Sequence, residues 1–440
     1  MSVGVQRLRE EPDRIRQGAI DKREDPSIVD RALETDARRR RLQSESDQLK
    51  AERNAASKQI GEAIRAGAKA DGPEVAALRA ESTRAGLRID EIDAELAATE
   101  AELGDLLLRI PNPADPDVPV GGEEANVTVR TWGEPGSHEE TAADGGTWAL
   151  RPHWEIGEAL DIIDNARGAK IAGSGFPVYK GQGSRLQRSL ISWCLDVHTR
   201  ENGFTEVWPP AVVNAESARG TGQIPDKEDQ MYVVTRDDLY LVPTAEVPVT
   251  NLHRDEIIEA SELPIRYAAY SPCFRREAGA AGSATRGILR VHQFDKVEMV
   301  FFERPERSAA ALDELVGFAE VLLQRLGLPY RVLLMATGDM GFVQSKKFDL
   351  EVWSPGVEDW LEVSSCSNFR DYQARRMAIR YRPEPGAKPE LVHTLNGSGL
   401  ALARVVAAII ETYQQPDGSV EVPAVLRARM GMDRIAAPGT

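Results

Sequence analysis

The chain has few cysteines, and they are far apart. Its 440 residues include only three, at positions 194, 273 and 366. An odd number of dispersed cysteines without a Cys-x-x-Cys pair predicts neither a disulfide framework nor a structural zinc site. We therefore expect a protein of the reducing cytoplasm.

Long hydrophobic stretches are also missing. No run of about 18 uncharged apolar residues occurs, and the amino terminus alternates charged and apolar side chains without the hydrophobic region of a signal peptide. The sequence thus predicts no membrane partner and no secretion. The formal net charge of −16 argues against a generally basic, DNA-binding protein, although a local basic surface stays possible.

The first hundred residues have the apolar periodicity of a coiled coil. From Val75 to Leu106, apolar or small residues recur at alternating steps of three and four, which is the seam of a long helix that packs on a partner. Residues 42–64 carry a similar seven-residue repeat, and glycine and proline at 66–73 separate the two runs. We predict an antiparallel helical hairpin over about residues 28–106.

The two predicted helices carry opposite charge. Residues 31–69 hold ten Lys or Arg against six Asp or Glu, whereas residues 71–105 hold three against ten. The first helix therefore has a net charge of +4 and the second of −7. A cationic helix fits a surface that contacts phosphate groups, but it is also the pattern of an ordinary solvated charge run.

A proline-rich segment follows the hairpin. Residues 109–126 contain four prolines and two adjacent glycines, which cannot continue a helix. We place an arm at residues 1–110, a linker at 111–126 and a second domain at 127–440. In that domain, strand-like and helical stretches alternate without regular βα spacing, which predicts an α+β fold with an antiparallel sheet flanked by helices.

A charged stretch at residues 273–298 predicts a polar hairpin of this sheet. Residues two apart on a strand point to one face, so Arg275 and Glu277 should share a face. On the second strand the same holds for His292, Phe294, Lys296 and Glu298. A guanidinium beside a carboxylate suits a nucleotide-like ligand. Cross-strand ion pairs on a solvated face are the alternative.

An arginine also occurs within an apolar stretch near the carboxyl end. Residues 394–427 begin with a polar, glycine-containing turn and continue as a hydrophobic helix that contains Arg404. An arginine buried in such a helix requires an anionic partner. Arg404 is therefore either a phosphate ligand or a residue at the helix edge or in a structural ion pair.

Together these stretches resemble the motifs of class II aminoacyl-tRNA synthetases. Residues 183–210 resemble motif 1, "FRRE" and "RVHQF" within residues 273–298 resemble motif 2, and "GSGLALAR" at 397–404 resembles motif 3. Further stretches resemble the seryl-tRNA synthetase family in particular, so that the resemblance covers nearly the whole chain. They are residues 51–61, 220–225, 243–252, 336–353 and 362–376.

The resemblance implies a fold, an activity and an assembly. Members of this family have a coiled-coil arm that binds tRNA(Ser), followed by a class II antiparallel-sheet domain, and they form homodimers through motif 1. They activate L-serine with ATP and Mg²⁺ to seryl-adenylate and transfer the seryl group to the 3′ end of the tRNA. No enzymic nucleophile is needed, so we expect His292 and His393 to be structural.

The resemblance also assigns site residues, each to the position that matches the family motif. The expected serine-binding residues are Thr244, Ala245, Glu246, Glu298 and Ser398. The expected ATP-binding residues are Arg275, Arg276, Glu277, Val291, Glu362, Val363, Ser364, Ser365 and Arg404. Of these, Arg275, Glu277 and Arg404 are expected to act in catalysis, and Glu362 and Ser365 to hold Mg²⁺ through ATP. Turn or cap chemistry is the alternative for Thr244 and Ser398.

The basic first helix is the expected tRNA-binding face of the arm. The family recognises the long variable arm of its tRNA by shape and backbone, which requires cations and little reading of bases. The candidate residues are Arg38, Arg39, Arg40, Arg41, Lys50, Arg53 and Lys58.

The sequence departs from the family pattern in the motif 2 loop, where Ser283 and Ala284 replace the usual Arg-Asp. This keeps two alternatives open besides a serine-tRNA ligase. One is a paralogue dedicated to antibiotic self-resistance or to supplying seryl-tRNA for a biosynthetic pathway. The other is a catalytically inactive tRNA or regulatory binder, in which we would expect Arg275, Glu277, Glu362 or Arg404 to be lost.

Overall fold

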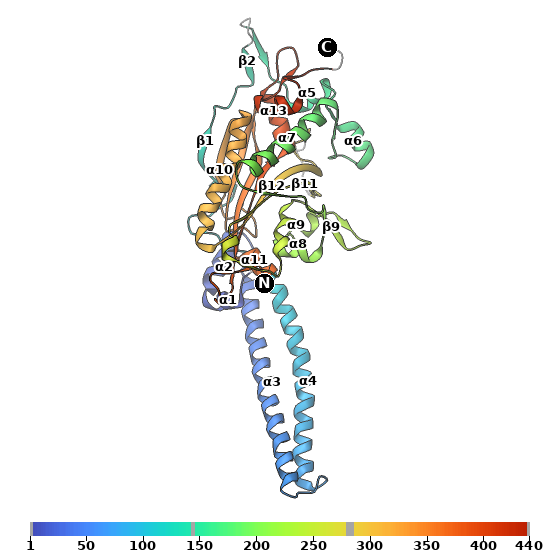
Figure 1. Cartoon of the computed structure of the whole chain (residues 1–440), viewed down its shortest axis with the longest axis vertical. Coiled ribbons are helices and arrows are strands. Elements are labelled where there is room, and N and C mark those ends of the chain that lie inside the picture. The colour runs from blue at the N-terminus through green and yellow to red at the C-terminus, as the bar shows by residue number, and fades with distance from the viewer. Residues whose placement is uncertain (1–2, 142–145, 279–285, 438–440) are drawn as a thin grey trace. The chain divides into compact units, whose positions relative to one another are not determined.

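A computed structural model describes residues 3–141, 146–278 and 286–437 (Figure 1). The chain divides into two compact units. The arm unit contains Met1–Ile20 and Glu24–Pro111, and the sheet unit contains Asp21–Arg23 and Asn112–Thr440. Each unit has its own core and is described by itself.

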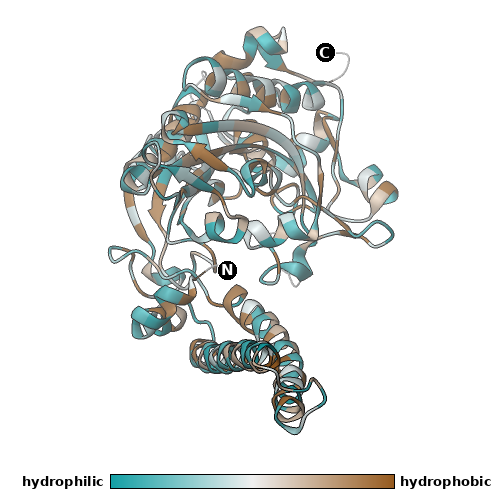
Figure 2. Ribbon diagram, turned by 60° about the horizontal axis from the view of Figure 1, so that its bottom comes forward, coloured by the Kyte–Doolittle hydropathy of each residue, from teal (hydrophilic) through white to brown (hydrophobic). Residues whose placement is uncertain are grey.

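The arm unit is a helical hairpin preceded by two short helices. Its elements are α1 (Val5–Glu10), α2 (Pro12–Asp21), α3 (Ser27–Arg65) and α4 (Pro73–Leu108). Proline at the first position of α4 fits a helix start, because the missing N–H would have no partner there. Figure 2 shows both long helices alternating between hydrophobic and hydrophilic residues along their length, as expected when one stripe is apolar.

The predicted coiled-coil seam is confirmed along most of the hairpin. On α4 the buried side chains include Val75, Ile89, Ile92 and Leu103, at the predicted positions. The continuation of the seam on α3 through Ile64 is wrong, since this side chain is 41% exposed and α3 ends one residue later. The seam therefore reaches the tip on α4, at Val75, but on α3 it does not extend to Ile64.

Polar contacts also join the two arm helices. Ser46 Oγ donates to Oδ1 of Asp93 at 3.0 Å, and Lys50 Nζ lies 3.3 Å from the same oxygen. Arg88 of α4 pairs with Glu45 of α3 at 3.1 Å. The opposite charges of the two helices thus pair partly with each other.

The sheet unit contains the remaining elements. Its helices are α5 (His153–Ala159), α6 (Asn165–Ala172), α7 (Gly181–Arg200), α8 (Ala215–Thr221), α9 (Glu246–Thr250), α10 (Ser308–Leu326), α11 (Tyr372–Met377), α12 (Leu402–Thr412) and α13 (Ala424–Met430). In the part of the chain that the structure describes, no helix combines the length and apolarity needed to cross a bilayer.

An eight-stranded sheet organises this unit. Its order is β1 (Val127–Trp132), β13 (Tyr330–Leu334), β14 (Lys346–Ser354), β15 (Asp359–Arg370), β18 (His393–Ala401), β12 (Gln293–Glu303), β11 (Ile265–Phe274) and β6 (Thr205–Val207). All neighbouring pairs are antiparallel except β11 with β6, which is parallel. The predicted α+β fold with an antiparallel sheet is therefore confirmed, with one parallel edge.

The other strands form small sheets around the large one. They are β2 (Glu139–Thr141) with β3 (Thr147–Ala149), β4 (Ile163–Asp164) with β5 (Val178–Tyr179), β7 (Val212–Asn214) with β8 (Val233–Val234) and β9 (Leu239–Leu241), β10 (Ile257–Glu259) with β16 (Arg380–Arg382) and β17 (Glu390–Leu391), and β19 (Val420–Glu421) with β20 (Arg434–Ile435).

Alternation along β12 divides the sheet into an apolar and a partly polar face. Val297, Met299 and Phe301 point into the main core, which α7, α10 and α12 also build. On the opposite face, Val300 and Phe302 join a second core with α9 and α11. Lys296 and Glu298, which precede them on the same face of β12, are charged. This face of the strand therefore changes along its length from the apolar core to the candidate site.

Residues 112–126, expected as a linker, pack within the sheet unit. Asn112 is buried, and its Nδ2 donates to the carbonyl oxygens of Val343 and Phe369 at 3.0 and 2.9 Å. Val118 is buried in a small apolar cluster with Leu333. The prolines prevent a long helix, and the backbone N–H groups of Asn112 and Asp115 donate instead to the carbonyl oxygens of Phe342 and Ser345.

The seam of the arm yields a stability prediction. We expect Ile92→Ala, which empties a fully buried seam position, to destabilise the hairpin by about 2–5 kcal/mol. Leu87→Ala on the same helix is the matched control, because Leu87 is 62% exposed and its loss should cost less than about 0.5 kcal/mol. Urea unfolding followed by far-ultraviolet circular dichroism measures both, and equal costs would contradict the seam.

Candidate functional site

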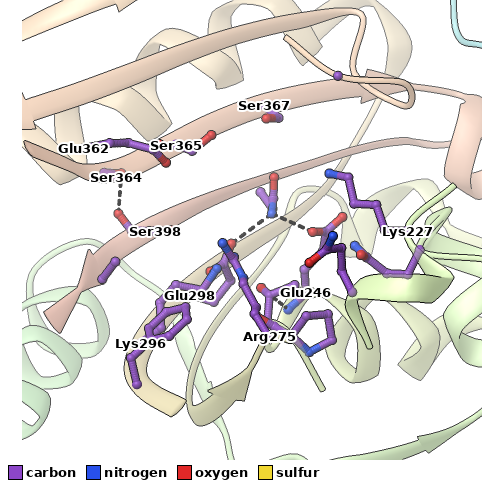
Figure 3. A pocket seen from close by; sticks show the side chains of 18 of the residues that line it. Lys227, Glu246, Arg275, Lys296, Glu298, Glu362, Ser364, Ser365, Ser367 and Ser398 are labelled. Atoms are coloured by element: carbon purple, nitrogen blue, oxygen red, sulfur yellow. Dashed lines mark hydrogen bonds and ion pairs between the residues drawn. The ribbon is translucent and has the colours of Figure 1, made fainter. Parts of the chain in front are cut away.

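A cavity of about 520 Å³ opens in the sheet unit (Figure 3). Strands β12, β15 and β18 contribute to its wall, together with the segments around residues 223–231, 243–246, 289–291 and 339–347. Its lining is charged: carboxylates gather near Glu246 and Glu298, and cations lie at Arg275, Lys347 and Arg404. The cavity therefore suits a ligand that carries charges of both signs.

Two buried carboxylates share one amide at the first end of the cavity. Nδ2 of Asn396, on β18, donates to Oε1 of Glu298 at 2.9 Å and to Oε2 of Glu246 at 3.0 Å. All three side chains are buried. One amide group thus fixes the spacing of two like charges that would otherwise repel each other.

A second amide orients Glu246. Nε2 of Gln373, on α11, donates to Oε1 of Glu246 at 2.6 Å, and Thr394 Oγ1 donates to Oε1 of Gln373 at 2.7 Å. Burial, and then the nearby Glu298, raise the pKa of Glu246 to about 7, although the hydrogen bond from Gln373 works in the opposite direction. A cationic ligand would restore the ionised form.

Glu298 keeps an oxygen for a ligand. Its Oε2 lies 2.6 Å from Nζ of Lys296 but has no well-directed hydrogen bond, although it is buried. The contact is therefore an ion pair of poor hydrogen-bond geometry, and the oxygen can still accept from a hydroxyl or ammonium group.

The other end of the cavity is an ionic cluster. Nζ of Lys347 lies 2.9 Å from Oδ2 of Asp349 on β14, and burial raises the pKa of Asp349 to about 7 in spite of that lysine. The surrounding cations, Lys347 and Arg404 first, hold the pKa of Glu362 below its ordinary value. Glu362 therefore faces the cavity as a carboxylate.

A β-bulge brings Glu362 and Ser365 to the same side. Residues three apart on a regular strand point to opposite faces, but in the pairing of β14 with β15 the register shifts between Leu350 and Glu351, so that Val363 is extra. Both residues consequently line the cavity. A carboxylate and a hydroxyl are hard oxygen donors, which fit Mg²⁺ held mainly by phosphates.

Arg404 lies at the start of α12, at the edge of the helix. Its Nε donates to the carbonyl oxygen of Leu289 and its Nη1 to that of Glu362, both at 2.9 Å, and Nη1 lies 3.9 Å from the Glu362 carboxylate. The edge position and the ion pair considered for Arg404 are both present, and the side chain also lines the cavity. It is therefore placed to meet an anion there.

Arg275 and Glu277 lie beyond the strand that was predicted to carry them. β11 ends at Phe274, and Glu277 has a left-handed backbone with φ of 49°. Both nevertheless line the cavity: Arg275 stacks over the Phe294 ring at 5.2 Å, and Glu277 pairs with Arg290 at 2.8 Å. The expectation of a shared strand face is wrong because the chain turns away after Phe274.

The second strand of the motif behaves as predicted, with one exception. Phe294, Lys296 and Glu298 share a face of β12 and line the cavity. His292 precedes the strand, and its Nδ1 lies 3.0 Å from the carbonyl oxygen of Arg275. It does not line the cavity, and its contact with Arg275 supports the turn of motif 2.

The remaining expected ligands divide into lining and supporting residues. Thr244, Val291, Val363, Ser364 and Ser398 line the cavity. Thr244 Oγ1 also accepts from the backbone N–H of Glu246 at 3.2 Å, so the turn chemistry considered for it is present, and Ser364 Oγ donates to the carbonyl oxygen of Ser398.

Two expected ligands do not reach the cavity with their side chains. Ala245 is fully buried in the second core, beside Val249. Nη1 of Arg276 donates to the carbonyl oxygen of Asp229 at 2.9 Å, away from the cavity lining. Ser283 and Ala284 lie outside the described residues.

Two buried residues hold the wall segment that contains Leu289. Glu411 of α12 accepts from Nδ1 of His153 at 2.7 Å, and Nε2 of His153 accepts from the backbone N–H of Ile288 at 3.2 Å. Nδ1 therefore carries a proton and points it at Glu411. His393, in contrast, contacts Ser308 Oγ at 2.7 Å, and burial lowers its pKa to about 4.

Comparison with known proteins gives the family. The family model of the seryl-tRNA synthetase N-terminal domain matches residues 4–114, and that of the tRNA synthetase class II core domain (G, H, P, S and T) matches residues 232–413. A serine–tRNA ligase of Thermomicrobium roseum is 55% identical over 96% of this chain and 92% of its own length. The chain belongs to the seryl-tRNA synthetase family.

Further members of the seryl-tRNA synthetase family support this relation. A serine–tRNA ligase of a Roseiflexus species is 51% identical over 98% of both chains. The crystal structure of seryl-tRNA synthetase from Pyrococcus horikoshii complexed with ATP superimposes with a TM-score of 0.91, at 37% identity and with 99% of each chain covered.

Several cavity residues of this seryl-tRNA synthetase family member were not singled out from the sequence. Asn396 directly precedes the motif 3 stretch "GSGLALAR", and Lys347 and Asp349 lie two apart within residues 336–353, where the strand period could have paired them. Gln373 had no such signal, because its role depends on the packing of α11 against the sheet.

The shared amide gives a prediction. Asn396→Ala should destabilise the sheet unit by about 1–3 kcal/mol, since two buried carboxylates lose a donor. Because the pKa of Glu246 is raised in the folded state, the free energy of unfolding falls as the pH rises toward about 7. Without the amide donor this fall should be larger. The destabilisation by Asn396→Ala should therefore be greater at pH 8 than at pH 6.

Urea unfolding followed by tryptophan fluorescence measures this cost, because all seven tryptophans lie in the sheet unit. Asn202→Ala is the control. Its partner is His198, whose pKa burial lowers to about 4, so the cost of the control should be the same at both pH values. A pH-independent cost for Asn396→Ala would argue against the shared amide.

Proposed function

We propose that this protein is a serine–tRNA ligase, which activates L-serine with ATP and transfers the seryl group to the 3′ end of tRNA(Ser). The observation that carries the proposal is the bipolar cavity, with two amide-linked carboxylates at one end and a cluster of cations at the other. The full-length similarity to serine–tRNA ligases supports it and gives no support to an antibiotic-linked paralogue.

Serine fits the carboxylate end. Its ammonium group is attracted to Glu246, and its hydroxyl group can donate to the Glu298 oxygen that lacks a directed hydrogen bond. Thr244 and Ser398 add polar groups on the same wall. A site built to bond a hydroxyl rejects alanine strongly, because the buried carboxylate then stays unpaired.

ATP fits the cationic end. We infer that Arg275 meets the α-phosphate or the serine carboxylate, that Val291 packs against the adenine and that Arg404 meets the γ-phosphate. Glu362 and Ser365 would hold Mg²⁺, which neutralises phosphate charge when bound. The four residues expected to be lost in an inactive binder, Arg275, Glu277, Glu362 and Arg404, are all present and line the cavity.

The reaction then needs position and charge, and no enzymic nucleophile. A serine carboxylate oxygen attacks the α-phosphorus in line, the bond to the pyrophosphate oxygen breaks, and seryl-adenylate forms. Cations at the phosphate end stabilise the charge that develops at phosphorus. The tRNA 3′-terminal hydroxyl subsequently attacks the activated carbonyl and releases AMP.

The arm offers two cations for tRNA phosphates. Of the seven candidates, Arg38, Arg39, Arg40, Lys50 and Lys58 have carboxylate partners within the arm unit. Arg41 and Arg53 are exposed, and within the described residues neither has an ion pair. A cation without an intramolecular partner binds phosphate at a lower cost, so we expect these two to contribute most.

We further infer a homodimer through motif 1, in the cytoplasm. The motif comprises α7 and β6, and the residue that follows β6, Trp208, is 79% exposed, which suits burial by a second copy. All three cysteines are buried free thiols, as expected in a reducing compartment.

The function is tested by amino-acid-dependent exchange of pyrophosphate into ATP. We expect exchange with L-serine, and at least about a thousandfold lower kcat/KM with alanine, because only serine has a hydroxyl group that can donate to Glu298. Charging of tRNA(Ser) with radiolabelled serine tests the second step. Equal exchange with serine, alanine and threonine would contradict the proposal.

The arm gives a separate prediction. Arg41→Ala combined with Arg53→Ala should weaken tRNA binding and reduce the log-log salt slope by roughly one unit for each tRNA phosphate that the variant no longer neutralises. Replacement of Arg38, which pairs with Glu102, is the matched control and should change the slope less. Serine-dependent exchange should stay unchanged in all these variants. An unchanged slope in the double variant would exclude these two arginines as phosphate contacts.

A further inference from the structure

Lys227 is a cavity-lining cation to which neither the family motifs nor the mechanism above gives a role. We propose that its ammonium group binds an anionic oxygen at the junction of the two substrates, where the serine carboxylate meets the α-phosphate of ATP. The inference rests on the proposed function and adds a substrate-binding residue to it.

The position of Lys227 supports this role. The residue lies in the turn before the short helix of residues 228–230, and its side chain lines the cavity. In Figure 3 it is on the same side of the pocket as Glu246, with Glu362 and Ser365 on the strand across from it. It thus lies on the wall near the carboxylate end, across the pocket from the phosphate end.

The charges around Lys227 come from both ends of the cavity. The charges that act on Lys227 are those of Asp226 first, then the cations Arg275 and Lys347, and then Glu246. A serine molecule whose ammonium group lies at Glu246 directs its carboxylate away from that residue, toward the cations. We therefore expect the junction of the two substrates to lie near the ammonium group of Lys227.

Lys227 also lacks a fixed partner. Within the described residues no carboxylate lies within ion-pair distance of its ammonium group, although Asp226 precedes it in the chain. Its side chain is exposed and lines the cavity. An ammonium group without a carboxylate partner can bind an entering anion without first breaking an ion pair.

The turn that carries Lys227 is tied to the motif 2 segment. The backbone N–H of Lys227 donates to the carbonyl oxygen of Gln223 at 2.7 Å, and the carbonyl oxygen of Gln230 accepts from the backbone N–H of Arg276 at 2.9 Å. Oε1 of Gln230 accepts from the N–H of Ala278 at 3.1 Å. Hydrogen bonds therefore join the segment that carries Lys227 to the segment that carries Arg275, as two cations for one anion would require.

The test compares charged ligands with neutral analogues in Lys227→Gln. Calorimetry gives the affinity for serine and for serinamide, which lacks the carboxylate, and for AMP and adenosine, which differ by the α-phosphate. We expect Lys227→Gln to lower the affinity for at least one charged ligand by about ten- to a hundredfold and to leave the affinity for its neutral analogue unchanged. The affected pair tells whether the carboxylate or the phosphate is bound.

Two further variants separate binding from folding. Glu228→Ala, in the same turn and exposed, should bind all four ligands as the wild type does. Lys227→Arg keeps the charge and should recover part of the lost affinity. Equal losses for charged and neutral ligands in Lys227→Gln would show a structural role, and no loss for any ligand would show no role. Either result overturns the inference.

The failure of the proposed function is visible without any Lys227 variant. If the wild type neither binds serine nor exchanges pyrophosphate in its presence, both proposals fall. If the wild type is active and Lys227→Gln keeps the wild-type kcat/KM for serine and for ATP, only the role of Lys227 falls.

Discussion

The amide group of Asn396 holds two buried carboxylates at hydrogen-bonding distance, and the order of the cavity follows from this contact. Burial, and then repulsion from the like charge of Glu298, raise the pKa of Glu246. The pair is stable when a donor lies between the carboxylates and a cation arrives from the cavity. The anionic end thus determines where an ammonium group binds, and the cations across the cavity determine where its carboxylate points.

The sheet makes this arrangement rigid. Glu298 lies on β12 and Asn396 on the neighbouring β18, and the strand pairing aligns Glu298 with Ser398. The opposite face of β12 is buried under α7, α10 and α12, so the strand cannot rotate without exposing Val297 and Met299. The same packing that stabilises the fold therefore preorganises the site.

Much of the fold could be predicted from the sequence, because periodicity reports it directly. The seven-residue seam predicted the hairpin through Val75 and Ile92, and the period of two predicted the shared face of Phe294, Lys296 and Glu298. The end of the seam was missed at Ile64, since periodicity does not show where a partner helix stops.

The site was harder to predict from the sequence than the fold. The class II motifs located most of its residues, but the bulge that brings Glu362 beside Ser365 depends on the pairing of β14 with β15, and the turn after Phe274 that places Arg275 depends on tertiary contacts. Lys227 lines the cavity, and Gln373 supports Glu246 from α11, but neither residue is marked by a strand or helix period. Such residues are found only from the coordinates.

The central claim is that the buried carboxylate pair is prepared for the serine ammonium group, and proton release on serine binding tests it most directly. Titration calorimetry at pH 7 in two buffers of different ionisation enthalpy should show the release of about half a proton, because the ammonium group returns Glu246 to its ionised form. The affinity for serine should rise about tenfold between pH 6 and pH 8. A serine affinity that is constant over this range, without proton release, would contradict the claim.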